Sequence, residues 1–236
     1  MKQMNRRGAG RTVTKVVAEL RARANPANVA GMARYGINPE NTLGVSIPSL
    51  RAMAKRIGTD HALARELWAS GIHEARVLAG LVDDPALVTA AQLERWAKDF
   101  DSWDVCDGVC SNLFDRTPHA WDKAVAWSAR SREFVKRAGF VLMAALAVHD
   151  KKAPDERFRE FFPLIEREAV DERNFVKKAV NWALRQIGKR NRALNRDAIA
   201  AAKRIRKIDS RSARWIAADA LRELESDAVR ERLSKR

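Results

Sequence analysis

Apolar residues recur at three- and four-residue intervals along almost the whole chain, which is the spacing of one face of an α-helix. The few glycines and prolines, 11 and 7 in number, mostly fall between these periodic segments. No segment shows the alternation of apolar and polar residues that is typical of a half-buried strand. The pattern therefore predicts an all-α protein. Helices are expected over residues 13–22, 47–58, 60–71, 73–82, 89–100, 102–114, 118–129, 132–149, 154–169, 174–189, 193–207 and 212–225.

Residues with strong positional preferences mark several of the predicted helix ends. Asp60 and Thr89 stand where an N-cap side chain would accept a hydrogen bond from the first turn. Pro48 falls in the first turn of its helix, where its missing N–H has no partner to lose. Gly58 and Gly71 each follow the last apolar position of a predicted helix, where a glycine commonly ends the helix. These signals support the boundaries that the periodicity gives.

The predicted helices also form repeating pairs. The stretches "EARVLAGLV", "VKRAGFVLMAAL", "VKKAVNWALRQI" and "SARWIAADALREL" each combine a basic residue with small and apolar residues at helical spacing. A loose period of about 30–45 residues with two helices per unit is typical of a HEAT-like α-solenoid. We expect one solenoid domain over residues 12–236, preceded by a basic, disordered tail over residues 1–11. The alternative is a helical bundle without repeats. The near-equivalent positions are Arg76, Asp107, Arg137, Lys178 and Arg214.

In such a solenoid the second helices of successive pairs line one concave surface. Asp107, Arg137 and Lys178 would then follow one another along it. Trp103 lies one helical turn before Asp107, and Trp182 lies one turn after Lys178. The pattern therefore predicts a groove in which one carboxylate, two tryptophans and several cations converge.

The charge of the chain indicates what this groove would hold. The chain has 45 Lys and Arg residues against 30 Asp and Glu, a formal net charge of +15 in 236 residues. An excess of this size favours a polyanionic partner, most often nucleic acid. The alternative is a solvated basic surface with no dedicated partner. We expect a concave basic groove that binds nucleic acid.

Several other classes of protein do not fit the sequence. No run of about 18 apolar residues suggests a membrane span, and the polar, basic first dozen residues lack the apolar segment of a secretory signal. A cytosolic monomer is therefore expected. Cys106, Cys110 and His119 do not have the number or spacing of a zinc module, and no glycine-rich phosphate loop is present. Neither a metal nor an organic cofactor is expected.

Five stretches occur in the order seen in a known family. They are "MARYGI", "LGVSIPSLRAMAK", "SWDVCD", "VKRAGFVL" and "VKKAVNWALRQIGK", and the similarity runs from about Asn28 to Lys189. In these stretches the chain resembles the AlkD-like DNA alkylation repair proteins. The resemblance implies a HEAT-like solenoid that clasps duplex DNA. It also implies a monofunctional DNA glycosylase that excises N3- or N7-alkylated purines.

The resemblance also implies roles for individual residues. The family's catalytic aspartate and its tryptophan in the W-x-x-x-D motif fall on Asp107 and Trp103. Its groove arginine falls on Arg137, its second groove tryptophan on Trp182, and a tyrosine of the M-A-R-Y segment on Tyr35. The expected catalytic set is thus Asp107, Trp103, Trp182 and Arg137. The expected DNA-binding residues are Tyr35, Arg137, Lys178, Arg185 and Lys189.

These residue types suit the chemistry. Alkylation at N3 or N7 makes the purine a cationic leaving group, and positive charge develops on the sugar as the glycosidic bond breaks. A preorganised carboxylate and aromatic faces both stabilise that charge. Cys106, directly before Asp107, departs from the family pattern. Two alternatives remain at this point: a nucleic-acid-binding solenoid of the same fold without catalysis, and a protein-interaction scaffold.

Overall fold

The computed structural model describes residues 12–235, and the expected basic tail lies outside the described residues. Within these residues every regular element is a helix, which confirms the all-α prediction. The chain folds as two compact units, one up to Leu87 and one from Val88 onward, and each is described by itself. The expectation of a single domain over residues 12–236 stays a prediction.

The first unit contains five helices within its described residues, four of which match the periodicity. The additional helix, α2, begins because the Asn25 side chain accepts hydrogen bonds from the amides of Ala27 and Asn28, and because Pro26 occupies the first helical position. Its apolar pattern is too weak to have indicated a helix, and none of its residues is buried. The helices are α1 (Val13–Ala22), α2 (Pro26–Arg34), α3 (Ile47–Ile57), α4 (His61–Ala69) and α5 (His73–Val82).

A buried carboxylate organises the loop between α2 and α3. Glu74, in the first turn of α5, is 1% exposed and accepts hydrogen bonds from three consecutive backbone amides. The distances from its oxygens are 2.9 Å to the amide nitrogen of Leu43, 2.6 Å to that of Gly44 and 3.2 Å to that of Val45. Gly44 has a φ of +78°, and a Cβ there would lie 2.2 Å from the carbonyl oxygen of Asn25. Only glycine fits this close approach without strain.

The second unit carries three of the four repeated stretches, and the first of the four lies in α5 of the first unit. The helix boundaries of the second unit agree with the caps that the sequence indicates: Thr89, for example, accepts a hydrogen bond from the amide of Gln92. The helices are α6 (Ala90–Lys98), α7 (Trp103–Asn112), the short 3-10 helix η1 (Phe114–Arg116), α8 (Ala120–Ser128), α9 (Glu133–His149), α10 (Asp155–Arg159), α11 (Phe161–Glu168), α12 (Asn174–Gly188), α13 (Arg192–Ile205), α14 (Arg211–Leu224) and α15 (Asp227–Ser234).

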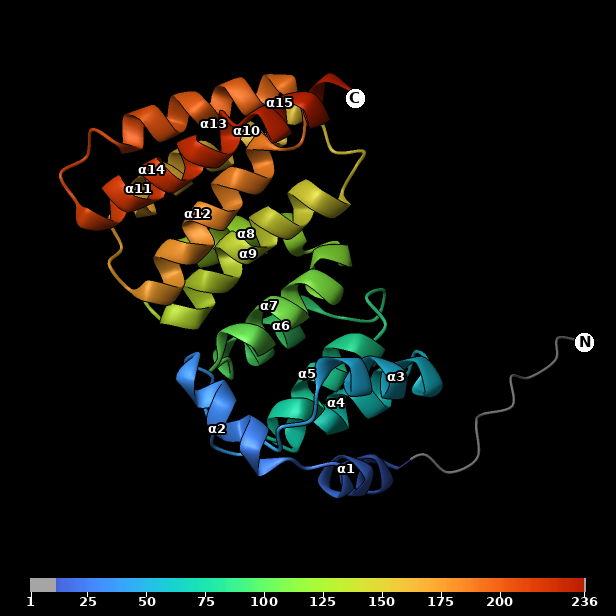
Figure 1. Cartoon of the computed structure of the whole chain (residues 1–236). Coiled ribbons are helices and arrows are strands. Elements are labelled where there is room, and N and C mark those ends of the chain that lie inside the picture. The colour runs from blue at the N-terminus through green and yellow to red at the C-terminus, as the bar shows by residue number, and fades with distance from the viewer. Residues whose placement is uncertain (1–11, 236) are drawn as a thin grey trace, which may run out of the picture. The chain divides into compact units, whose positions relative to one another are not determined.

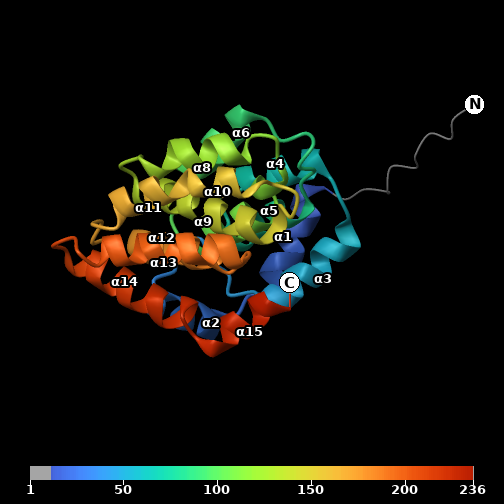
Figure 2. The same ribbon diagram turned by 90° about the horizontal axis from the view of Figure 1, so that it is seen from above.

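The second helices of successive pairs lie side by side within this unit. Helix α9 packs against both α7 and α12, and α12 packs against α14 (Figure 1). The first helices α8, α11 and α13 contact one another in the same order, and Figure 2 shows α9 between α8 and α12. At the α8–α9 contact, a Cβ on Gly139 would lie 2.6 Å from the backbone nitrogen of Ser128, so this position also requires glycine. The predicted line of second helices is thus present in the second unit.

Two segments differ from the expected helices. The single helix expected over residues 154–169 is divided at Glu160 into α10 and α11. Pro163 falls in the first turn of α11, where its missing N–H leaves no intrahelical hydrogen bond unmade. A further helix, α15, follows the last predicted one, and the Ser226 side chain accepts a hydrogen bond from the amide of Val229 to cap it.

Cys106 and Cys110 are free thiols that are fully buried on α7. The thiol of Cys106 contacts the carbonyl oxygen of Phe134 at 3.5 Å, and that of Cys110 contacts the carbonyl oxygen of Ala138 at 3.9 Å, both on α9. Burial raises the pKa of Cys110 well above its usual value, which keeps it a neutral packing residue. Over residues 12–235, no helix is both long enough and apolar enough to span a membrane.

Candidate functional site

An open hollow of about 460 Å³ lies on the second helices of the second unit. Helices α7, α9, α12 and α14 each contribute at least one side chain to it. Asp107, Arg137, Lys178, Trp182 and Arg185, all predicted as site residues, meet here. The lining residues are Asp107, Arg137, Lys178, Asn181, Trp182, Arg185, Trp215 and Asp219.

Asp107 and Arg137 form a two-pronged ion pair at one end of the hollow. The Nε of Arg137 donates to Oδ1 of Asp107 at 2.8 Å, and Nη2 donates to Oδ2 at 2.7 Å. Nη1 of the same guanidinium donates to the carbonyl oxygen of Phe175 in the first turn of α12, at 2.6 Å. This fork geometry fixes the carboxylate in one orientation. Arg137 therefore connects α7, α9 and α12 through a single side chain.

The surroundings of Asp107 disfavour its charged form. Burial raises the pKa of the Asp107 carboxyl above its ordinary value, and the Arg137 hydrogen bonds and charge partly oppose this. The nearby carboxylate of Asp104 adds a smaller contribution in the raising direction. The side chain of Asp107 is 18% exposed against 7% for Arg137, so the carboxylate is the more accessible partner. A partly desolvated carboxylate of this kind is strongly attracted to any cation that enters the hollow.

The two predicted tryptophans are placed differently. Trp182 is half-buried and lines the hollow together with Asp107. Trp103 is also half-buried, one turn before Asp107 on α7, but it is not among the residues that line the hollow. The structure thus brings Asp107, Arg137 and Trp182 together and leaves Trp103 beside them.

A second carboxylate organises the opposite end of the hollow. Oδ2 of Asp219 accepts hydrogen bonds from Nδ2 of Asn181 at 2.7 Å and from Nη1 of Arg185 at 2.9 Å, and Oδ1 pairs with Arg222. Arg185 also contacts Oε2 of Glu223 at 3.0 Å. The charge of Arg185 is therefore largely compensated, although the residue lines the hollow.

The predicted cations differ in how free they are to meet a ligand. Lys178 is exposed, lines the hollow and has no carboxylate within ion-pair distance among the described residues. Lys189 is only 14% exposed, is paired with Glu223 at 2.6 Å and is not among the lining residues. Lys178 is thus the predicted cation that is best placed to receive an anionic ligand.

Sequence reasoning missed three lining residues, Trp215, Asn181 and Asp219. Most tryptophans are buried, so the residue type alone did not mark Trp215, yet it is 40% exposed. One signal was present: "WIAAD" over residues 215–219 repeats the W-x-x-x-D spacing of "WDVCD" over residues 103–107. Of the two motifs, the first contributes its aspartate to the hollow and the second contributes both its tryptophan and its aspartate.

Tyr35, the remaining predicted DNA contact, belongs to the first unit. It follows the last residue of α2 and is 76% exposed. Its role as a DNA contact stays a prediction.

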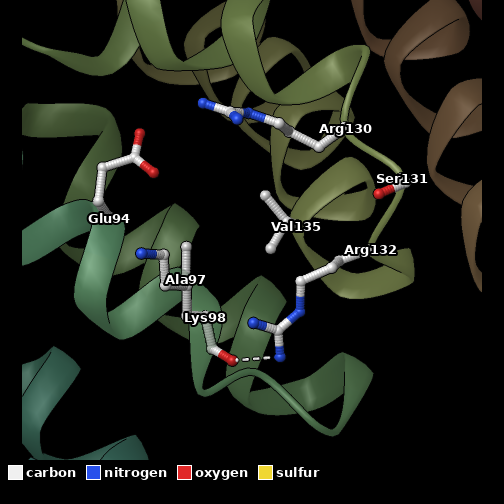
Figure 3. Close-up of a pocket in the computed structure, with 7 residues that line it drawn as sticks. All are labelled: Glu94, Ala97, Lys98, Arg130, Ser131, Arg132 and Val135. Carbon is white, nitrogen blue, oxygen red and sulfur yellow. Dashed lines mark hydrogen bonds between the residues drawn. The ribbon is translucent and has the colours of Figure 1, made fainter.

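A smaller hollow of about 140 Å³ lies between α6 and the turn that joins α8 to α9 (Figure 3). Ala97 and Val135 give it an apolar part, and Arg132 donates a hydrogen bond to the carbonyl oxygen of Lys98 at 2.8 Å. Its cations are Lys98, Arg130 and Arg132, whereas the one carboxylate, Glu94, is already paired with Lys123 at 2.5 Å. This hollow offers positive charge for a phosphate-bearing ligand.

Comparison with known protein families identifies the chain. Residues 16–224 match the model of the family described as DNA alkylation repair enzyme. The chain belongs to this family. The resemblance in the five sequence stretches is thereby confirmed, and the family match extends beyond it at both ends.

A solved structure shows the same fold. It is described as representing a new family of proteins related to the HEAT-like repeat DNA glycosylases with affinity for branched DNA structures. Its sequence is 21% identical to that of this member of the DNA alkylation repair family, and the TM-score is 0.78. The match covers 94% of this chain and 96% of the chain in the solved structure. The predicted HEAT-like fold is confirmed. No curated protein matches the chain.

Proposed function

We propose that this protein is a DNA glycosylase that hydrolyses the glycosidic bond of N3- and N7-alkylated purines in duplex DNA. The observation that carries the proposal is the ion pair of Asp107 and Arg137, which holds a partly desolvated carboxylate in an open hollow beside Trp182. Membership of the DNA alkylation repair family and the net charge of +15 support it. Arg137, Lys178 and Tyr35 would contact the DNA backbone, and the protein would act as a monomer.

The reaction needs few groups because the substrate is already activated. The bond between the sugar C1′ and the purine nitrogen breaks, and its electron pair neutralises the positive charge of the alkylated base. Water forms the new bond to C1′ and releases one proton. Asp107 would stabilise the positive charge on the sugar and accept a hydrogen bond from the attacking water. The indole of Trp182 would favour the same cation through its negative face.

The Arg137 pairing is compatible with these roles. Each carboxylate oxygen of Asp107 accepts one hydrogen bond from Arg137, and an ionised carboxylate has about four acceptor sites in all. Room therefore remains for water on the exposed side. A DNA phosphate that attracted Arg137 would further free the carboxylate and increase its negative potential.

The direct test is release of the damaged base. The protein is incubated with duplex DNA that contains 7-methylguanine, and the free base is measured by chromatography against a protein-free control. Duplex DNA with uracil is the matched control, because uracil is a neutral base and leaves far less readily. We expect release of 7-methylguanine and no release of uracil. Equal rates for the two substrates, or no release from either, would contradict the proposal.

DNA binding without catalysis is the second candidate, and one observation favours it. Both oxygens of Asp107 accept a hydrogen bond from Arg137. This geometry is also typical of an ion pair that only stabilises the fold. The related solved protein is described by its affinity for branched DNA structures. Tight DNA binding with no base release in the assay above would favour this candidate.

The acid limb of the activity should report the pKa of Asp107. Because burial raises this pKa, the carboxylate is protonated at a higher pH than an ordinary aspartate, and activity falls as the pH drops through the raised value. Arg137→Gln removes an influence that holds the pKa down, so the limb should move to still higher pH. The measurement is the single-turnover rate against pH, corrected for spontaneous depurination. An unchanged limb in Arg137→Gln would contradict the assignment.

Lys178 on α12 and Lys189, which directly follows this helix, give a matched test of phosphate contact. Lys178→Ala should weaken binding to any duplex and lower the slope of log K against log salt by about 1, because an unpaired cation releases about one counterion. Lys189→Ala should change the slope less, because Glu223 already neutralises that charge at 2.6 Å. Fluorescence anisotropy at several salt concentrations measures both. Equal slopes for Lys178→Ala and the wild type would exclude this contact.

A further inference from the structure

We propose that Trp215 is a stacking platform for an unpaired base, so that the protein prefers DNA with an extrahelical nucleotide to a fully paired duplex. Because it takes DNA as the ligand, this inference rests on the proposed function. It adds a binding site and a substrate feature that catalysis at Asp107 does not require.

The exposure of Trp215 is the first reason. Of the seven tryptophans, it alone is exposed, with 40% of its surface accessible, whereas Trp68, Trp96 and Trp127 are at most 4% exposed. A large indole left partly in water on a packed helical repeat forgoes a substantial gain from burial. Its position in the lining of the hollow gives that exposed ring a ligand-facing surface.

The charges around the ring indicate the kind of ligand. The Lys177 ammonium lies 5.7 Å from the ring centroid, over one face of the indole. A flat ligand can therefore stack only on the opposite face. Lys178 lines the same hollow, and Arg211 lies one turn before Trp215 on α14. An aromatic face with cations around it is how proteins hold the bases and phosphates of single-stranded nucleic acid.

Neighbouring contacts hold the platform in place. Asp219 lies one turn after Trp215, and its carboxylate is bound by Asn181 and Arg185 from α12. These bonds connect α14 to α12 one helical turn after Trp215. Because Asn181, Arg185 and Arg222 together hold the Asp219 carboxylate, we assign it a positioning role.

The shape of the hollow also favours a strand over a small molecule. Sites for small molecules enclose most of the ligand in a largely apolar cavity. This hollow is open, and five of its eight lining residues carry a formal charge. Such a surface suits a ligand that remains partly in solvent, as a nucleotide on a DNA strand does.

The test uses undamaged DNA, so that no bond is broken. A short duplex with one bulged 2-aminopurine is compared with the fully paired duplex of the same sequence, and the dissociation constants are measured by anisotropy. A base stacked on an aromatic ring should tighten binding to the bulged duplex by between about five-fold and about a hundred-fold. Stacking should also quench the 2-aminopurine fluorescence. Equal affinity for the two duplexes would overturn the inference.

Three variants separate stacking from charge and from folding. Trp215→Leu should abolish both the preference for the bulge and the quenching, while the affinity for paired duplex and the salt slope stay as in the wild type. Trp215→Phe should keep most of the preference, because it keeps an aromatic face. Lys178→Ala should weaken binding to both duplexes equally. The inference would be overturned if Trp215→Leu kept the preference for the bulged duplex. It would also be overturned if this variant lost affinity equally for both duplexes while its melting temperature was unchanged.

The result can be told apart from the outcome of the glycosylase assay. Release of 7-methylguanine without any preference for the bulge would leave the proposed function standing and remove the stacking platform. A preference for the bulge without base release would support the stacking platform and contradict the proposed glycosylase activity.

Discussion

Asp107→Asn is expected to lower the rate of 7-methylguanine release by at least about 100-fold, the effect seen when one preorganised electrostatic group is removed from an active site. Asparagine keeps the size of the side chain and one oxygen acceptor, but it carries no negative charge. The stabilisation of the sugar cation is lost with that charge. Binding to duplex DNA should stay the same or tighten, because a carboxylate beside phosphates is repulsive. Single-turnover release and anisotropy on undamaged duplex measure the two effects.

The neighbouring acid provides a matched control. Asp104 lies on the same helix, and its Oδ1 accepts a hydrogen bond from the amide of Val105 at 2.9 Å, but it does not line the hollow. Asp104→Asn removes the same charge from a position a few ångströms along the chain and should change the release rate by no more than a few-fold. A rate in Asp107→Asn within a few-fold of the wild type would rule out a catalytic role for Asp107.

The second large effect concerns stability and lies in the first unit. Glu74→Ala leaves the buried amides of Gly44 and Val45 and the partly buried amide of Leu43 without their acceptor. Each unsatisfied amide costs about 1–3 kcal/mol, so the free energy of unfolding should fall by about 3 kcal/mol or more. For a chain of this length that corresponds to a drop of about 10 °C in the melting temperature. Thermal unfolding followed by circular dichroism measures it.

Two comparisons show whether the lost acceptor is the cause. Glu74→Gln keeps one acceptor oxygen and should recover part of the stability. Glu66→Ala removes an exposed glutamate from α4 and should change the free energy of unfolding by no more than about 0.5 kcal/mol. If Glu74→Ala melted at the temperature of Glu66→Ala, the three amides would have to be satisfied in another way.

Helix periodicity was enough to predict most of the fold. The apolar spacing placed four of the five helices of the first unit, and the repeat placed the second helices of successive pairs in one row. The missed helices, α2 and α15, are short, begin at Asn25 and Ser226 caps, and bury little apolar surface. Their signal lies in local hydrogen bonds and in packing against neighbours, which an apolar pattern does not record.

The site was predictable only in part, for a related reason. Spacing along a helix shows that Trp103 and Asp107 share a face, and the resemblance to the repair family assigns their roles. Neither the spacing nor the resemblance determines which of the two side chains on that face reaches a hollow built by other helices. The exposure of Trp215 and the burial of Glu74 likewise depend on contacts between residues that are far apart in the sequence. Pairing across repeats is therefore the information that a single sequence lacks.

The three contacts of Arg137 also limit how this protein can change its length. Solenoids commonly gain or lose whole repeats, because each repeat contacts only its neighbours. Here one guanidinium joins Asp107 on α7 to Phe175 on α12, across three consecutive pairs. Duplication or deletion of a pair between these helices would separate the two partners and dismantle the site. The number of helix pairs from α7 to α12 is therefore fixed. Helix pairs added beyond α14 would leave the contacts of Arg137 intact.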